Sequence, residues 1–160
     1  MNQSFWAAVG EASISPTLPV TLTGRGGNPP TANAIDLESP PITRALWLKD
    51  GLGNNAVLVT VDLLGVDQAI VDVVQQASEL QLPSGQQVPV LLNASHTHNA
   101  PTTAIVWEGA AGKQEPYNGS YVDNILVPGI RQAIQQAKES PRACGPSIRE
   151  HDERRGRLPP

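Results

Sequence analysis

Apolar residues gather in short runs along the chain, and two of these runs, at 56–66 and 88–94, are continuous and rich in Val and Leu. Such runs are typical of strands buried on both faces of a sheet. Between them, residues 67–80 place apolar side chains at helical spacing. Strand, helix and strand in this order predict a parallel crossover, because the connection is long enough to bring the chain back to the same edge.

Further strands are predicted on the N-terminal side of this unit. Residues 42–50 form another apolar run, and the turn residues between Asp50 and Asn55 join it to 56–66, which predicts a hairpin. We also expect a strand over Trp6–Ser13. The segment between these strands is interrupted by Gly and Pro and predicts a long loop.

A second helix is predicted over Tyr121–Lys138, with Pro128-Gly129 expected to kink or split it. After Ser140 the apolar periodicity disappears and Arg becomes frequent. The sequence therefore predicts an α/β fold with a mixed sheet over residues 1–140. We expect residues 141–160 to be an irregular charged tail, disordered or produced by a frameshift.

Composition narrows the class of protein. The chain has 160 residues and a net charge of −4, which argues against a general binder of nucleic acid or anionic membranes. No apolar run approaches the roughly 18 residues that a transmembrane helix needs. The first residues lack a signal-peptide pattern. We therefore expect a cytoplasmic protein as written, or a secreted or periplasmic one if an upstream segment is missing.

The single cysteine and the lack of a glycine-rich phosphate-binding motif argue against several further kinds of site. Cys144 is the single cysteine, so neither an internal disulfide nor a cysteine-based zinc site is expected. No glycine-rich phosphate-binding motif follows a predicted strand, which ranks a nucleotide-binding function last.

The segment Ser-His-Thr-His-Asn-Ala-Pro, at 95–101, carries the strongest candidate chemistry. His96 and His98 point to the same side if the preceding strand continues through them. Neutral imidazole is a good zinc ligand, and the neighbouring polar residues could fix its tautomer. The spacing alone is a weak signal for a metal and favours a pair of hydrogen-bonded histidines in a polar loop.

Asp62 is the only charged residue within the run 56–66. A charge in a buried strand is costly unless it is paired. Asp62 could lie near His96 or His98 and orient an imidazole or a metal-bound water. Alternatively, it lies at the end of the strand and caps the following helix. The sequence leaves both readings open.

Four segments in order give the chain a family resemblance: VGEASISP, ITRALWLKDG, AVLVTVDLLGV and LLNASHTHNAP. Together they resemble the N-terminal part of the catalytic domain of the neutral/alkaline non-lysosomal ceramidases, over roughly residues 7–138. The resemblance implies an incomplete N-terminal portion of a larger hydrolase domain. It implies a zinc-dependent amide hydrolase that cleaves N-acylsphingosine or a related N-acyl amide into a fatty acid and an amine. It maps a zinc ligand onto His96 and catalytic residues of the active site onto His98 and Asp62.

The sequence departs from the family pattern beside the histidines. Asn99-Ala100 stands where the family has Ser-Gly, and Thr102-Thr103 stands where Gly-Gly often follows the proline. The family's remaining zinc ligands, a His, a Glu and a Tyr, lie farther along a longer chain. We therefore expect an incomplete site with a small lipid-like or N-acyl amide substrate. The alternative is a non-catalytic truncated remnant or binding module of the same fold; the sequence does not indicate an oligomeric state.

Overall fold

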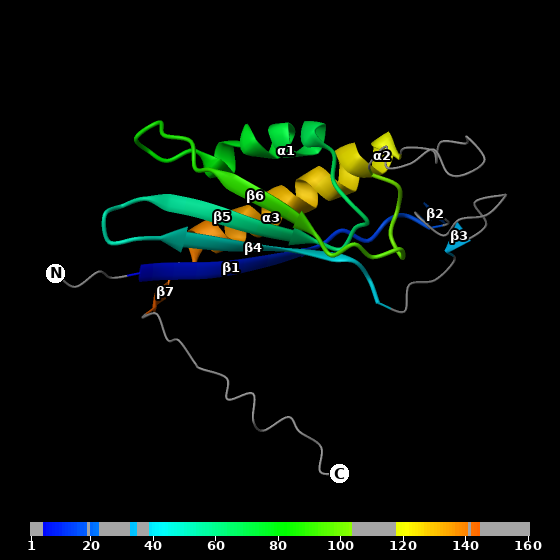
Figure 1. Cartoon of the computed structure of the whole chain (residues 1–160), viewed down its shortest axis with the longest axis horizontal. Coiled ribbons are helices and arrows are strands. Elements are labelled where there is room, and N and C mark those ends of the chain that lie inside the picture. The colour runs from blue at the N-terminus through cyan, green and yellow to red at the C-terminus, as the bar shows by residue number, and fades with distance from the viewer. Residues whose placement is uncertain are drawn as a thin grey trace, which may run out of the picture.

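The computed structural model describes residues 5–18, 20–22, 33–34, 39–103, 118–140 and 142–144. These residues form a five-stranded sheet whose helices lie on one face (Figure 1). The strand order is β6-β5-β4-β1-β7. The strands are β1 (Phe5–Ser13), β4 (Ile42–Lys49), β5 (Asn55–Val61), β6 (Val90–Ala94) and β7 (Arg142–Cys144). A separate small sheet pairs β2 (Val20–Thr21) with β3 (Asn33–Ala34).

The sheet is mixed, which confirms the predicted fold class. Strand β4 pairs antiparallel with both β1 and β5, whereas β5 and β6 are parallel. The β4–β5 hairpin closes through Asp50, whose carboxylate accepts from the backbone amides of Leu52 and Asn54 at 2.8 and 2.9 Å. The crossover from β5 to β6 carries helix α1 (Gln68–Gln75) and a 3₁₀-helix, η1 (Ser78–Leu80).

The crossover elements are shorter than the sequence predicts. Helix α1 ends at Gln75 rather than near residue 80, because the side-chain amide of Gln87 donates to the carbonyls of Gln75 and Ala77. The last strand starts at Val90 rather than Val88. Its start is set by the Gln75 side chain, which donates to the Val88 carbonyl and accepts from the Val90 amide, both at 2.9 Å.

Only one face of the sheet is covered by the described residues. Val57, Val59 and Val61 of β5 are fully buried beneath the helices. Leu58 points to the other face and is 38% exposed. The prediction of a strand buried on both faces is therefore wrong for the described part of the chain, because a continuous apolar run does not by itself show which faces are covered.

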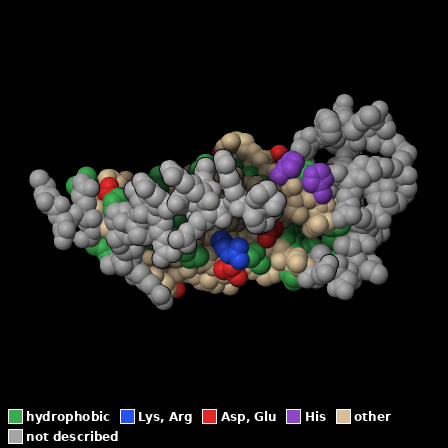
Figure 2. Space-filling model, turned by 60° about the horizontal axis from the view of Figure 1, so that its bottom comes forward, with side chains coloured by type: hydrophobic (Ala, Val, Ile, Leu, Met, Phe, Trp, Pro, Cys, Tyr) green, Lys and Arg blue, Asp and Glu red, His purple; other side chains and the backbone are tan. Residues whose placement is uncertain are grey.

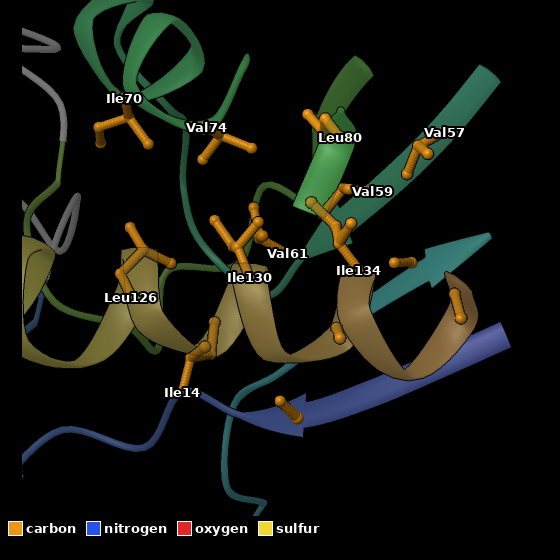
Figure 3. Close-up of a cluster of buried hydrophobic side chains, with 14 of the residues drawn as sticks. Ile14, Val57, Val59, Val61, Ile70, Val74, Leu80, Leu126, Ile130 and Ile134 are labelled. Carbon is orange, nitrogen blue, oxygen red and sulfur yellow. The ribbon is translucent and has the colours of Figure 1, made fainter. Parts of the chain in front are cut away.

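The helical segment after residue 118 packs across this covered face. It comprises α2 (Gly119–Tyr121), a π-helix η2 (Val122–Leu126) and α3 (Val127–Glu139). The π-turn directly precedes Pro128, where a proline lacks an amide proton and disturbs the preceding turn. This irregularity matches the predicted break near Pro128-Gly129. Figure 3 shows Leu126, Ile130 and Ile134 pointing toward the buried side chains of β5 and the crossover.

A short strand lies within the C-terminal segment that the sequence predicts to be irregular. Within the predicted irregular tail, residues 142–144 form β7, which pairs antiparallel with the start of β1. The other residues of that tail lie outside the described part of the chain, so its boundary remains a prediction. Among the described residues, no helix is long and apolar enough to cross a membrane.

Candidate functional site

The candidate site lies where β5 and β6 end. Parallel strands finish at the same edge of a sheet, so the turn after β5 and the segment after β6 come together there. The backbone amide of Ser95 donates to the Val61 carbonyl at 3.0 Å and joins the two segments. Figure 2 shows the two described histidines side by side on the surface near one end of the molecule.

His96 is held in an unusual conformation. Its φ is 63°, and it is the one described non-glycine residue with a positive φ. The left-handed region is disfavoured for residues with a side chain, and such conformations cluster at functional sites. Its Nδ1 lies 2.9 Å from the carbonyl oxygen of Leu64. Because a carbonyl can only accept, Nδ1 carries the proton, and in neutral imidazole the lone pair of Nε2 then remains available to a ligand.

His98 lies next to His96. The two ring centroids are 5.4 Å apart, and the ring planes meet at 81° in an edge-to-face arrangement. Both residues are exposed. Strand β6 ends at Ala94, so the rings are brought together by the turn at His96 and not by a continuing strand.

Asp62 follows the last residue of β5 and is half-buried. Its Oδ2 accepts from the backbone amide of Ile42 at 3.2 Å, and its own amide donates to the Ile42 carbonyl at 3.1 Å. The residue at the N-cap of α1 is Asp67, so Asp62 does not cap that helix. The structure thus brings the two histidines together and directs the Asp62 carboxylate to the first residue of β4. The catalytic role of Asp62 remains a prediction.

The loop after His98 turns inward. Ala100 is fully buried and has no positive φ, so its methyl group fills the core at the position where the resembling family has Gly. Thr102 and Thr103 are each 2% exposed. The Thr103 hydroxyl donates to the Gly65 carbonyl at 3.0 Å. The Thr102 carbonyl accepts from the amide of Asn118, at the start of the helical segment, at 2.9 Å.

Sequence reasoning missed the groups that hold His96. We expected Ser95, Thr97 or Asn99 to fix the imidazole tautomer, but the Leu64 carbonyl does so. The Thr97 hydroxyl instead accepts from the Asn99 amide at 3.2 Å. Every residue has a backbone carbonyl, so the amino-acid sequence does not indicate which carbonyl will bind the imidazole. Thr103 could have been singled out from the sequence, because Thr102-Thr103 stands where the resembling family often has Gly-Gly.

The described residues bring two imidazoles together at the end of β6. His96 has the tautomer that a metal ligand needs, and His98 places a second imidazole beside it. A catalytic zinc normally takes three protein ligands. The described part of the chain contains no group of three or more His, Cys, Asp or Glu side chains that could hold a metal ion. These residues alone therefore do not form a complete zinc site.

Comparison with solved structures finds ceramidases. The chain is similar to neutral ceramidase from Pseudomonas aeruginosa, with a TM-score of 0.71 and 20% identity over 89% of this chain and 23% of that one. A ceramidase complexed with C2 gives a TM-score of 0.64 and 21% identity over 89% of this chain and 22% of that one. Neither a scan against protein-family models nor a search of curated proteins gave a match. The likeness confirms the predicted fold, which is that of part of the solved ceramidases, and the chain spans less than a quarter of their length.

Proposed function

We propose that the chain carries the N-terminal part of a zinc-dependent amide hydrolase of the neutral ceramidase type. Its substrate would be N-acylsphingosine or a related N-acyl amide, and its products a fatty acid and an amine. Two independent lines support the proposal: the fold likeness to ceramidases and the motif segments that resemble that family.

The observation that carries the proposal is the bond between His96 Nδ1 and the Leu64 carbonyl. Metal-ligating histidines commonly donate their second ring N–H to a carbonyl or carboxylate, which fixes the tautomer and strengthens the ligand. His96 has this arrangement, and it is the residue onto which the resemblance maps a zinc ligand. The strained backbone at the same residue is a further mark of a functional position.

Each of the other two residues then has a definite role. His98, whose ring lies 5.4 Å from that of His96, would bind the substrate or move a proton at the scissile amide. Asp62, half-buried directly after β5, would be the second catalytic residue and orient an imidazole or a metal-bound water. When zinc is bound in such enzymes, it polarises the carbonyl and lowers the pKa of a bound water. The described residues supply at most two imidazole ligands for such a zinc ion.

Zinc binding by histidine variants tests the proposal. The 160-residue chain would be titrated against a chromophoric zinc chelator as wild type, His96→Ala and His98→Ala. His151→Ala serves as the matched control, since it removes the third histidine of the chain from a position outside the motif. We expect zinc binding that is weak for a zinc enzyme, that His96→Ala abolishes and that His151→Ala leaves unchanged. Equal zinc binding by wild type and His96→Ala would refute the assignment of His96.

Hydrolysis tests the reaction itself. The longest product of the gene would be assayed for release of fatty acid from a fluorescent N-acylsphingosine, with and without a chelator. We expect zinc-dependent release that His96→Ala removes. The alternative, a non-catalytic module of the same fold, predicts no stoichiometric zinc and no hydrolysis of any N-acyl amide.

A further inference from the structure

Thr103 joins the loop after the histidines to the turn after β5. Its side chain is almost completely buried, and its hydroxyl donates to the Gly65 carbonyl at 3.0 Å. The preceding carbonyl in that turn, of Leu64, is the partner of His96 Nδ1. Neighbouring carbonyls of one turn are therefore bound by two residues of the segment that carries the histidines.

These bonds belong to a short series that connects the two segments. The Ser95 amide bonds to the Val61 carbonyl at the start of the series, His96 bonds to Leu64 in the middle, and Thr103 bonds to Gly65 at its end. His96 is itself exposed, so little packing restrains its ring. The direction of the Leu64 carbonyl, and with it the tautomer of His96, depends on how firmly the turn is held.

We propose that Thr103 is a positioning residue for His96: its hydroxyl fixes the Leu64–Gly65 turn, so that the Leu64 carbonyl keeps the proton on Nδ1 and leaves Nε2 for a ligand. The inference rests on the proposed role of His96. It also gives a physical reason for threonine at a position where the resembling family often has glycine, because glycine has no hydroxyl to make this bond.

Variants that lose or keep the Thr103 hydroxyl, compared with a matched control at another buried threonine, test the inference. Thr103→Val keeps the shape of the side chain and loses the donor, whereas Thr103→Ser keeps the donor. Thr43→Val is the matched control: Thr43 is fully buried, and its hydroxyl donates to the Thr60 carbonyl at 3.0 Å within the β4–β5 pair. Thr103→Ala is a second variant without the hydroxyl, and thermal melts show which variants fold.

The first readout is the tautomer of His96. Long-range ¹H–¹⁵N spectra of the 160-residue chain, at one pH at which imidazole is neutral, report which ring nitrogen carries the proton. The signals are assigned with His96→Ala. We expect the Nδ1–H form in wild type, Thr103→Ser and Thr43→Val, and a mixture of tautomers in Thr103→Val and Thr103→Ala. The second readout is zinc affinity, for which we expect a loss of about 10- to 100-fold in the two variants that lack the hydroxyl and none in Thr103→Ser or Thr43→Val.

The outcomes separate this inference from the proposed function. An unchanged His96 tautomer in a folded Thr103→Val or Thr103→Ala chain overturns the inference and leaves the role of His96 intact. The same tautomer change in Thr43→Val overturns it as well, as does unfolding of both Thr103 variants while Thr43→Val folds. If zinc binding does not depend on His96, the proposed function fails, but the tautomer result still decides the inference about Thr103.

Discussion

Helix α3 packs tightly on strand β1 at Gly10, and Gly10→Ala is the substitution that tests this contact. A Cβ at residue 10 would lie 2.0 Å from the carbonyl oxygen of Ala133 and 2.8 Å from the amide nitrogen of Ala137. Both atoms belong to the backbone of α3, so no side-chain rotation can relieve the clash. The helix itself must move away from β1.

The size of the effect follows from these distances. Cβ contacts shorter than 3.0 Å are essentially not observed, so the separation from the Ala133 oxygen must grow by at least 3.0 − 2.0 = 1.0 Å. That movement would loosen the buried contacts of Ile130 and Ile134 on the same helix. Overpacking a core costs about 1–3 kcal/mol, occasionally more, and we expect a loss of about 3 kcal/mol because only rigid atoms are involved. The melting temperature should fall by about 10 °C.

Thermal and urea unfolding, followed by circular dichroism, measure this loss. Gly65→Ala is the matched control, since a Cβ at residue 65 meets nothing within 4 Å and its φ is not positive. The control should change the free energy of unfolding by less than about 1 kcal/mol. A Gly10→Ala chain that melts within about 2 °C of wild type would refute the close packing of α3 on β1.

Three further predictions concern other parts of the fold. Tyr121→Phe removes the bond from the phenol to the Ile14 carbonyl, 2.7 Å long, and should cost about 1–3 kcal/mol in unfolding experiments. Burial raises the pKa of Tyr121, so the wild type should lose stability above about pH 10, the ordinary pKa of tyrosine, and Tyr121→Phe should lose less. Desolvation opposes ionisation of Glu79, but its bonds with Arg131 prevail and lower its pKa. Stability from this pair should therefore be complete above about pH 4.5, the ordinary pKa of glutamate, and be lost as the pH falls below that value through the lowered pKa of the folded state. Acid titration of Glu79→Gln should show a smaller decline. The sheet face that the described residues leave uncovered should make the chain self-associate and bind a hydrophobic dye. Val9 and Leu91 lie on it and are each 61% exposed. Val9→Thr combined with Leu91→Thr should reduce self-association in sedimentation experiments and dye binding in fluorescence experiments.

The parallel unit could be predicted from the sequence because its signals are local. Two Val- and Leu-rich runs around a segment with helical spacing predict strand, helix and strand, and the parallel pairing follows from the length of the connection. The same reasoning placed the His96 segment after the second strand, where the structure has it. For Asp62 the sequence left open whether it lies inside the first strand or at its end, and the structure has it directly after β5. Element ends were less predictable, because the side chains of Gln75 and Gln87 set them through contacts between distant residues.

Contacts made by the backbone could not be predicted. The tautomer of His96 depends on a carbonyl of Leu64, and neither the apolar run nor the histidine spacing contains that information. The positive φ of His96 could not be predicted either, because histidine is not one of the residues whose presence indicates a turn. Gly10 offered a better signal, because a glycine inside a predicted strand often marks the close approach of another segment. Its partner, helix α3, lies more than 100 residues away along the chain.

The fold and the site are stabilised by different kinds of contact, and this makes them separable by mutation. Between β1 and α3 the fold depends on close apolar packing, in which Gly10 leaves no room for a methyl group. At the end of β5 and β6, the exposed His96 ring donates from Nδ1 to the Leu64 carbonyl, and Thr103 donates to the next carbonyl of the same turn, that of Gly65. Loss of the Thr103 hydroxyl should therefore alter His96 in a chain that still folds. Gly10→Ala should instead lower the melting temperature and leave the His96 tautomer unchanged in the molecules that remain folded, because the helix packs on β1 and the turn follows β5.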